Sequence, residues 1–363
     1  MKWISKILGY ILLGVNMLAG IFLLLSAYST YFDPHVHPVC SCFGIFFPVL
    51  LLANLLFLIF WLIVYWRYAL LSVLFLALCW GSIRTYCPIN WFGEDAPENA
   101  IKILSYNTRA FGQKAQHTKE KSNDVLAYLT NSDADIICLQ EYIWGKKLKK
   151  QDIDYALRDY RYKHYQPLGK GLNGLGIYSR YPILSATPII YKSNRNGSVA
   201  YHIKVGKDTL LVINNHLESY KIHESDVETY QNIITPDTEK TYTGVRKLLN
   251  KMAIATSIRA TQADIVLEKV KEAKEKNIVI CGDFNDTPIS YTHHILQNEL
   301  NDAFVESGNG MGISYNQHHL YVRIDHILTS KNLKTYNCTV DNTTDASDHY
   351  PIWCYISLEN EHE

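Results

Sequence analysis

The first quarter of the chain is almost free of charge, and this feature restricts the possible folds most strongly. From Ile7 to Phe32 there are 26 residues without Asp, Glu, Lys or Arg. Further apolar runs cover residues 43–66 and 68–83. A helix of about 20 apolar residues spans the hydrocarbon core of a bilayer. The sequence therefore predicts a transmembrane anchor over residues 1–91, with helices at about 7–28, 45–66 and 68–84.

The few basic residues of this part predict its orientation, because Lys and Arg concentrate in short cytoplasmic loops. Lys2 and Lys6 precede the first run, Arg67 precedes the third, and the loop Tyr31–Cys42 has no Lys or Arg. We therefore expect an integral protein of the inner or plasma membrane, with the lipid bilayer as a partner and the rest of the chain extracytoplasmic. Arg84 opposes this orientation weakly, and a cleaved signal peptide is an alternative for the first run.

The charge balance also differs between the two parts. The whole chain has 35 Lys+Arg and 35 Asp+Glu. Residues 1–91 contain four basic residues and Asp33, so residues 92–363 keep 31 basic and 34 acidic side chains (35 − 4 and 35 − 1). Tight nonspecific binding of nucleic acid depends on Lys and Arg that neutralise phosphates. The balance disfavours such a binder, but it does not exclude an enzyme that cuts nucleic acid.

The loop between the first two apolar runs contains His35, His37, Cys40 and Cys42. These residue types ligate metals, but the H-x-H and C-x-C spacings are tight for a structural zinc site. We favour a polar loop with incidental thiols.

Beyond a linker at residues 92–100, strand and helix patterns alternate, which predicts an α/β domain over residues 101–358 and a short tail at 359–363. The pattern predicts a helix over Thr118–Thr130 and a long amphipathic helix from Gly244 to about Ala273. Polar residues repeatedly follow the expected strands. They are Asn107, Glu141, His216, Asp283, Asn285, Asp325, Asp348 and His349. Because strand ends and their loops build sites in α/β folds, we expect these residues to converge.

Six segments around these residues resemble the ordered motifs of the endonuclease/exonuclease/phosphatase superfamily. They are SYNTRAF (105–111), LQE (139–141), NNHLES (214–219), GDFND (282–286), RIDHIL (323–328) and SDHYP (347–351). The resemblance covers about residues 100–358. It implies a four-layer α/β sandwich, in which helices flank two mixed sheets, behind the all-α transmembrane region. It also implies a hydrolase of phosphate esters that depends on Mg²⁺ or Mn²⁺.

The resemblance assigns metal binding to Asn107, Glu141 and Asp348, and catalysis to His216, Asp283, Asn285, Asp325 and His349. Residue chemistry agrees with these roles. Glu141 offers the hard oxygen that Mg²⁺ prefers. Asp283 can orient or deprotonate water, and Asn285 can donate to phosphoryl oxygens. Asp325 would fix the tautomer of His349, while His216 would be a general acid or a phosphate ligand. Whether a histidine or Asp283 activates the water stays open.

The function that we expect is a membrane-anchored phosphodiesterase or nuclease, with nucleic acid or a phospholipid or its head group as substrate and no obligate protein partner. The alternatives are a sphingomyelinase-like or inositol-phosphate phosphatase activity and a catalytically dead binding domain. Residues 219–243 are expected to overhang the site and affect specificity. Arg109, Arg195 and Arg259 are interpreted as solvated surface residues.

Overall fold

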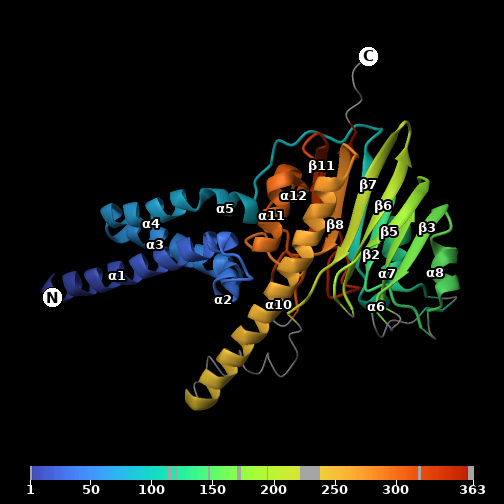
Figure 1. Ribbon diagram of the computed structural model, residues 1–363. Coiled ribbons are helices and arrows are strands. Elements are labelled where there is room, and N and C mark those ends of the chain that lie inside the picture. The colour runs from blue at the N-terminus through green and yellow to red at the C-terminus, as the bar shows by residue number, and fades with distance from the viewer. Residues whose placement is uncertain are drawn as a thin grey trace.

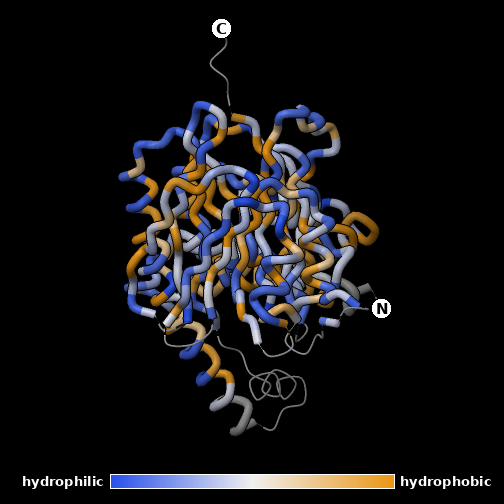
Figure 2. Tube along the Cα trace, turned by 90° about the vertical axis from the view of Figure 1, so that its right-hand side faces the viewer, coloured by the Kyte–Doolittle hydropathy of each residue, from blue (hydrophilic) through white to orange (hydrophobic). Residues whose placement is uncertain are grey.

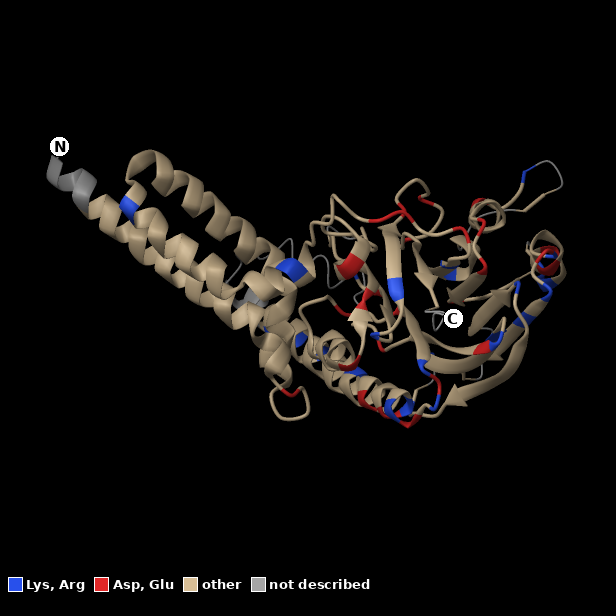
Figure 3. Cartoon of the chain, turned by 90° about the horizontal axis from the view of Figure 1, so that it is seen from above, with Lys and Arg blue, Asp and Glu red and all other residues tan. Residues whose placement is uncertain are grey.

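The computed structural model describes residues 2–112, 117–118, 121–145, 148–169, 173–193, 195–220, 238–317 and 320–358. For residues 2–6 and 238–242 it describes the backbone only. Figure 1 shows two parts, a helical bundle formed by the N-terminal residues and an α/β domain formed by the rest. Figure 3 shows that charged residues are spread over the α/β domain and are nearly absent from the bundle.

The bundle contains α1 (Lys2–Ala27), η1 (Ser29–Tyr31), α2 (Pro38–Ser41), η2 (Cys42–Phe46), α3 (Phe47–Val64), α4 (Trp66–Leu78) and α5 (Trp80–Tyr86). Two segments, Ile7–Tyr31 and Pro38–Val64, are long and apolar enough to cross a membrane. The expected third helix at residues 68–84 is instead two helices, α4 and α5, with a bend of 65° between them. These two helices count as a third span only if the bend lies within one crossing.

Polar side chains lie inside this bundle, while large apolar side chains lie outside. Asn16 Nδ2 donates to Ser72 Oγ at 3.0 Å, which links α1 to α4. Asn54 Nδ2 donates to the carbonyl of Ala19 at 3.1 Å, which links α3 to α1. Ile63, by contrast, is 79% exposed. Interhelical polar contacts with an apolar outer face are typical of helices that pack in lipid.

The α/β domain contains two six-stranded mixed sheets. The first has the order β11-β12-β1-β2-β4-β3 and the second β5-β6-β7-β8-β10-β9. The strands of the first sheet are β1 (Ile101–Asn107), β2 (Ile136–Gln140), β3 (Tyr162–Pro167), β4 (Gly174–Ser179), β11 (Lys334–Val340) and β12 (Ile352–Ser357). Those of the second are β5 (Ile183–Ile189), β6 (Gly197–Val205), β7 (Asp208–His216), β8 (Asn277–Asp283), β9 (Asn301–Asp302) and β10 (Asp325–Thr329). β1 runs parallel to β2, and β7 runs parallel to β8.

Alternation of side chains along the strands produces four layers. Ile103 packs in the cluster between the sheets, whereas Leu104, the next residue of β1, packs outward with Val125 and Ile153. The second sheet likewise directs Ile280 outward against Val266. Since successive strand residues point to opposite faces, both faces of each sheet are covered. The four-layer α/β sandwich expected from the sequence is therefore confirmed. Figure 2 shows the matching changes of hydropathy along the strands.

Helices form the outer layers: α7 (Asp124–Asn131) and α8 (Lys150–Ala156) cover the first sheet, and α10 (Thr238–Glu272) and α11 (Tyr291–Glu299) cover the second. Short helices α6 (Arg109–Gly112) and α12 (Ala303–Ser307) follow β1 and β9. Two expected boundaries differ. The helix predicted from Thr118 begins only at Asp124, because Asn123 caps it by accepting from Leu126 N at 3.0 Å. The long helix begins before Gly244, at Thr238.

Candidate active site

Strand pairing brings the expected site residues to one edge of the sandwich. In the parallel pairs, Asn107 lies opposite Gln140 and His216 lies opposite Asp283. β10 is antiparallel to β8 and begins with Asp325 opposite Asp283. β12 is antiparallel to β1, so the residues just before Ile352 lie close to the end of β1. Four strands (β1, β2, β7 and β8) therefore end around the same point, and two strands (β10 and β12) begin there.

A cavity of about 410 Å³ opens at this point. Seven of the eight expected residues line it, namely Asn107, Glu141, His216, Asp283, Asn285, Asp348 and His349. The eighth, Asp325, lies behind His349. A larger cavity of about 1360 Å³, between residues 89–94 and β11, contains none of the eight. The smaller cavity is therefore the candidate active site.

His349 is held between two carboxylates. Its Nδ1 lies 2.8 Å from Asp325 Oδ2, and its Nε2 lies 3.7 Å from Asp283 Oδ2. Burial alone would lower the pKa of His349, but the charges of Asp325 and Asp283 outweigh burial and raise this pKa to about 10. The ring is thus protonated at neutral pH, with Nδ1–H donating to Asp325 and Nε2–H directed toward the cavity.

Asp283 is fully buried at the end of β8. Its Oδ2 accepts from Asn107 Nδ2 at 2.9 Å, and its Oδ1 accepts from the backbone N–H of Asn285 at 2.8 Å. Burial raises the pKa of Asp283 to about 6, against the opposing charge of His349. Asp283 is therefore ionised at neutral pH but more basic than an ordinary Asp, which suits a general base.

His216 differs electrically from His349, although both rings approach Asp283. His216 Nε2 lies 3.8 Å from Asp283 Oδ2 and 3.9 Å from Glu141 Oε1. Burial lowers the pKa of His216, and the nearby charge of Asp283 only partly offsets this. His216 is therefore neutral at neutral pH. The two histidines thus have different protonation states, which is typical of sites where acid and base roles are divided.

Backbone strain occurs beside the cavity. Arg109, Glu141 and Asn285 have φ values of +44°, +47° and +53°, in the left-handed region that residues other than glycine seldom adopt. Each follows the end of a strand and lines the cavity. Asn285 Nδ2 donates to the carbonyl of Leu217 at 3.0 Å, which orients this side chain toward the end of β7. Left-handed residues of this kind are frequent at functional sites, where the strain is part of the arrangement.

The donors in the cavity fit a hard divalent cation. Four carboxylates line the cavity (Glu141, Asp283, Asp286 and Asp348), and a fifth, Asp325, lies behind His349. The cationic groups beside them are the Arg109 guanidinium, the protonated His349 imidazole and the buried Arg259 guanidinium, which pairs with Asp286. This leaves two excess negative charges. Glu141 is partly exposed to the cavity, and burial raises the pKa of its carboxyl group. Carboxylate and amide oxygens from Glu141 and Asn107 match the preference of Mg²⁺ for few protein ligands and several waters.

The site also contains residues to which the sequence assigned no role or a different one. Tyr315 packs edge-on against His349, with ring centroids 5.1 Å apart. Arg109, interpreted as solvated, lines the cavity and pairs with Asp348 through Nε–Oδ2 at 3.3 Å. The position of Arg109 inside the SYNTRAF motif was the sequence signal that could have placed it at the site. Arg259, also interpreted as solvated, is instead fully buried. No sequence signal marked Tyr315.

Some expected features fall elsewhere. Most of residues 219–243, which we expected to overhang the site, lies outside the described residues. In the first loop, His35 Nε2 pairs with Asp264 Oδ2 at 3.1 Å, and Cys42 Sγ contacts Thr256 Oγ1 at 3.4 Å. These loop residues thus contact α10. Two groups of described His, Cys, Asp and Glu residues have metal-binding proximity, and neither includes this loop.

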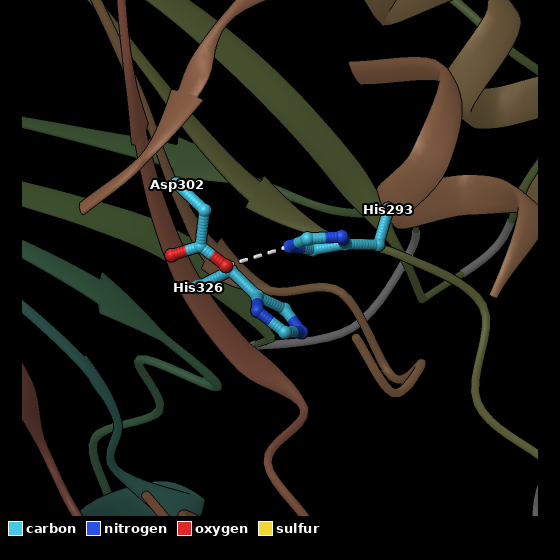
Figure 4. A group of neighbouring side chains, drawn as sticks. All are labelled: His293, Asp302 and His326. Atoms are coloured by element: carbon cyan, nitrogen blue, oxygen red, sulfur yellow. Dashed lines mark hydrogen bonds and ion pairs between the residues drawn. The ribbon is translucent and has the colours of Figure 1, made fainter. Parts of the chain in front are cut away.

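One of these groups is Asp283, Asp325 and His349 in the cavity, and the other is His293, Asp302 and His326 (Figure 4). In the second group, His293 Nε2 lies 2.8 Å from Asp302 Oδ2, and His326 Nε2 donates to the carbonyl of Asp286 at 2.9 Å. Burial lowers the pKa of His326 well below its ordinary value, so the ring is neutral. This group supports the loop after β8 from the face opposite the cavity, because His326 follows Asp325 on β10.

Comparisons with known proteins agree with this geometry. The family model described as the endonuclease/exonuclease/phosphatase family matches residues 104–349, which is more than half of the chain. The chain belongs to this family. A second family model, a domain of unknown function (DUF8431), matches residues 9–86. No curated protein matches the chain.

Several solved structures share the fold at low identity. The human Nocturnin catalytic domain with bound sulfate has a TM-score of 0.51 at 15% identity, covering 73% of this chain and 96% of that chain. D. rerio TDP2 complexed with single-strand DNA product has a TM-score of 0.50 at 17% identity, covering 72% and 100%. A family protein from Bacteroides thetaiotaomicron has a TM-score of 0.50 at 18% identity, covering 73% and 97%.

Proposed function

We propose that the protein is a membrane-anchored, divalent-metal-dependent phosphodiesterase. The observation that carries this proposal is the position of His349 between two buried carboxylates, with Nδ1 2.8 Å from Asp325 Oδ2 and Nε2 3.7 Å from Asp283 Oδ2. The raised pKa values of His349 and Asp283 agree with an acid and a base at this place. Both side chains face a cavity that also contains Arg109, Glu141 and Asn285. Membership of a family of phosphoesterase hydrolases supports the same reaction class.

The distance between Asp283 and His349 restricts their roles. In-line displacement puts the attacking and leaving oxygens on opposite sides of phosphorus, so an acid and a base that bond to these two oxygens approach the phosphate from opposite sides. At 3.7 Å, both residues serve the same side of the phosphate. In our proposal, Asp283 takes the proton of the attacking water, while His349 Nε2–H donates to a non-bridging phosphoryl oxygen. Asn285 and Arg109 are the other donors that face the phosphate.

The reaction balances as a hydrolysis. A bond forms between the water oxygen and phosphorus, the ester P–O bond breaks, and the water proton passes to Asp283. A cation held by Glu141 and Asn107 would neutralise the charge on the leaving oxygen and the phosphate. The leaving oxygen, on the opposite side of the phosphate, finally takes a proton from solvent, and Asp283 releases its proton to solvent. Tyr315 keeps the His349 ring in place through their edge-on contact.

Membrane anchoring is supported by the arrangement of the bundle. The N-terminus and the turn that joins α3 to α4 lie at the end far from the α/β domain, and residues 28–46 lie at the near end (Figure 1). Arg67 belongs to the far turn, whereas residues 31–42 have no Lys or Arg. This distribution favours a cytoplasmic far end and an extracytoplasmic α/β domain. A GFP fusion after Glu363 tests the proposal, since a fluorescent fusion would contradict the extracytoplasmic placement.

The activity is tested with the purified full-length chain and bis(p-nitrophenyl) phosphate in Mg²⁺ or Mn²⁺. We expect EDTA and His349→Ala each to abolish hydrolysis. His202→Ala is the matched control, because His202 pairs with Ser185 and Glu275 away from the cavity. Hydrolysis that survives both EDTA and His349→Ala would refute the proposal. Failure of a folded protein to hydrolyse any diester would favour a binding domain.

A further inference from the structure

We propose that the substrate is the phosphodiester of a membrane lipid, and that Ile45 of the N-terminal part forms the wall against which its apolar portion lies. The proposal rests on the phosphodiesterase function proposed above and names its substrate class. Its starting observation is that Ile45, from η2, lines the same cavity as Asp283 and His349. A residue from the segment between the two longest apolar helices thus belongs to the candidate active site.

Ile45 is held in this position by α10. It packs against a buried cluster formed by Cys42, Leu248 and Met252, together with Tyr220. Tyr220 itself lines the cavity, and its ring lies under the Arg259 guanidinium at 4.3 Å. The apolar segment and the catalytic domain therefore share one packed interface at the cavity wall.

The loop after β8 is inserted into the end of the bundle. Ile289 is 2% exposed and packs with Leu23, Ala27 and Phe47 from α1 and α3. This loop begins directly after Asp283, the last residue of β8. Because this loop cannot move without exposing Ile289, the catalytic carboxylate has a fixed position relative to the bundle.

A second connection fixes the other side of the site. Arg323 is 1% exposed and donates to the carbonyl of Thr85 at 2.7 Å and to that of Met311 at 3.0 Å. Thr85 belongs to α5, at the end of the bundle, and Arg323 lies two residues before Asp325. Both catalytic loops are thus attached to the same end of the bundle.

This attachment places the cavity at the depth of lipid phosphates. α1 ends at Ala27 and α3 begins at Phe47, so the segment between them would lie in the head-group layer of a bilayer that surrounds the helices. Ile45 lies within this segment. Val36 and Phe46 of the same segment are 66% and 46% exposed, as expected for residues in contact with lipid. A lipid phosphodiester would therefore reach the cavity at its natural depth.

The lining of the cavity suits one phosphate with an apolar substituent. Arg109 is the only Lys or Arg among the described residues that line it, and Asp348 already pairs with Arg109. Leu320, Val322 and Ile324 join Ile45 in the lining. A nucleic acid strand would bring further phosphates that need cations. The combination of one cation and an apolar wall favours a lipid phosphodiester over a polyanion.

The test compares two substrates with the same full-length protein. Sphingomyelin and phosphatidylethanolamine in mixed vesicles provide the lipid diesters, and bis(p-nitrophenyl) phosphate provides a soluble diester. We expect Ile45→Gln to lower the ratio of lipid to soluble kcat/KM by roughly tenfold, the usual effect of losing one apolar contact to a substrate. Leu320→Gln, on the catalytic-domain side of the wall, should lower the same ratio. Ile45→Val should retain it.

Val39→Gln is the matched control, because Val39 is a β-branched residue of the same segment that is 42% exposed and does not line the cavity. The proposal is overturned if Ile45→Gln and Val39→Gln give the same ratio, or if plasmid DNA is cleaved with a higher kcat/KM than both lipids. In either case, metal-dependent cleavage of the soluble diester would leave the proposed function intact. Loss of all diester cleavage in folded protein would instead remove the proposed function itself.

Discussion

Gly44 lies so close to the carbonyl of Ile289 that a Cβ atom at residue 44 would come 1.7 Å from that oxygen. Gly44 belongs to η2 of the N-terminal part, and Ile289 belongs to the loop that follows Asp283 and β8. Gly44→Ala therefore requires the two parts to move apart. We expect it to destabilise the full-length chain by about 2 kcal/mol, the usual cost of overpacking a well-packed contact. Thermal unfolding of the purified protein measures this loss.

Gly81→Ala is the control for this substitution. Gly81 lies in α5, and apart from its chain neighbours and its own helix backbone no described atom lies within 4 Å of the position that a Cβ would take. Because Ala favours the helix more than Gly does, we expect this variant to unfold at or slightly above the wild-type temperature. Equal stability of the Gly44 and Gly81 variants would contradict the close contact between the bundle and the loop after β8.

The pKa of His349 predicts how stability changes in alkaline solution. In the folded protein this pKa is about 10, above the ordinary value of 6.5, so the folded state holds the proton more tightly than the unfolded chain. The resulting stabilisation is complete below about pH 6.5 and is lost as the pH rises through about 10. One such group contributes at most about 1.4 kcal/mol per pH unit to the free energy of unfolding.

Asp283 acts in the same direction at lower pH. Burial raises its pKa from 3.8 to about 6, so folding favours the protonated form and stability falls as the pH rises across this range.

Urea unfolding of EDTA-treated protein measures the effects of both His349 and Asp283 on stability. We expect His349→Gln to flatten the decrease between pH 7 and pH 10, and Asp325→Asn to shift that decrease to lower pH. An unchanged slope in His349→Gln would show that the ring does not carry the proton.

Much of the fold follows from local sequence patterns. Ile103 and Leu104 are adjacent, yet they belong to different layers, because β1 is covered on both faces. Such continuous apolar strands with helical segments between them already predict the layered α/β arrangement. The bend between α4 and α5 was not predictable, since residues 68–83 form one uninterrupted apolar run.

The residues of the candidate site could be predicted from the sequence only where they follow strands. Asn107, Asp283 and His349 meet in one cavity because strand register brings the ends together. Ile45 reaches the same cavity because two separate parts of the chain pack together, and no local sequence pattern predicts this packing. The burial of Arg259 depends on Asp286, a partner that sequence spacing does not reveal.

Glu141 is the residue on which we expect cation binding to depend most. Its carboxylate is partly exposed to the cavity, where negative charge is in excess. Glu141→Gln keeps the size of the side chain but removes the charge, so we expect Mn²⁺ affinity to fall at least about tenfold, as it does when metal sites lose a polar contact. Isothermal titration calorimetry measures this without an assay of activity. Glu268→Gln, on the exposed face of α10, should bind Mn²⁺ like the wild type.

Arg259 connects α10 to the ends of β7 and β8. Its guanidinium is fully buried, with Nε 3.0 Å from Asp286 Oδ2 and one terminal nitrogen 2.6 Å from the carbonyl of Glu218. Arg259→Met would leave the Asp286 carboxylate buried without its partner, which costs about 4 kcal/mol. We expect Arg259→Lys to lose less stability than Arg259→Met, because Lys keeps the charge although it lacks the planar fork of donors.

Arg195→Met is the control, because Arg195 is exposed, and it should change stability by less than about 0.5 kcal/mol. Urea unfolding compares the three variants, and a similar loss in Arg259→Met and Arg195→Met would mean that the buried pair does not stabilise this edge of the site.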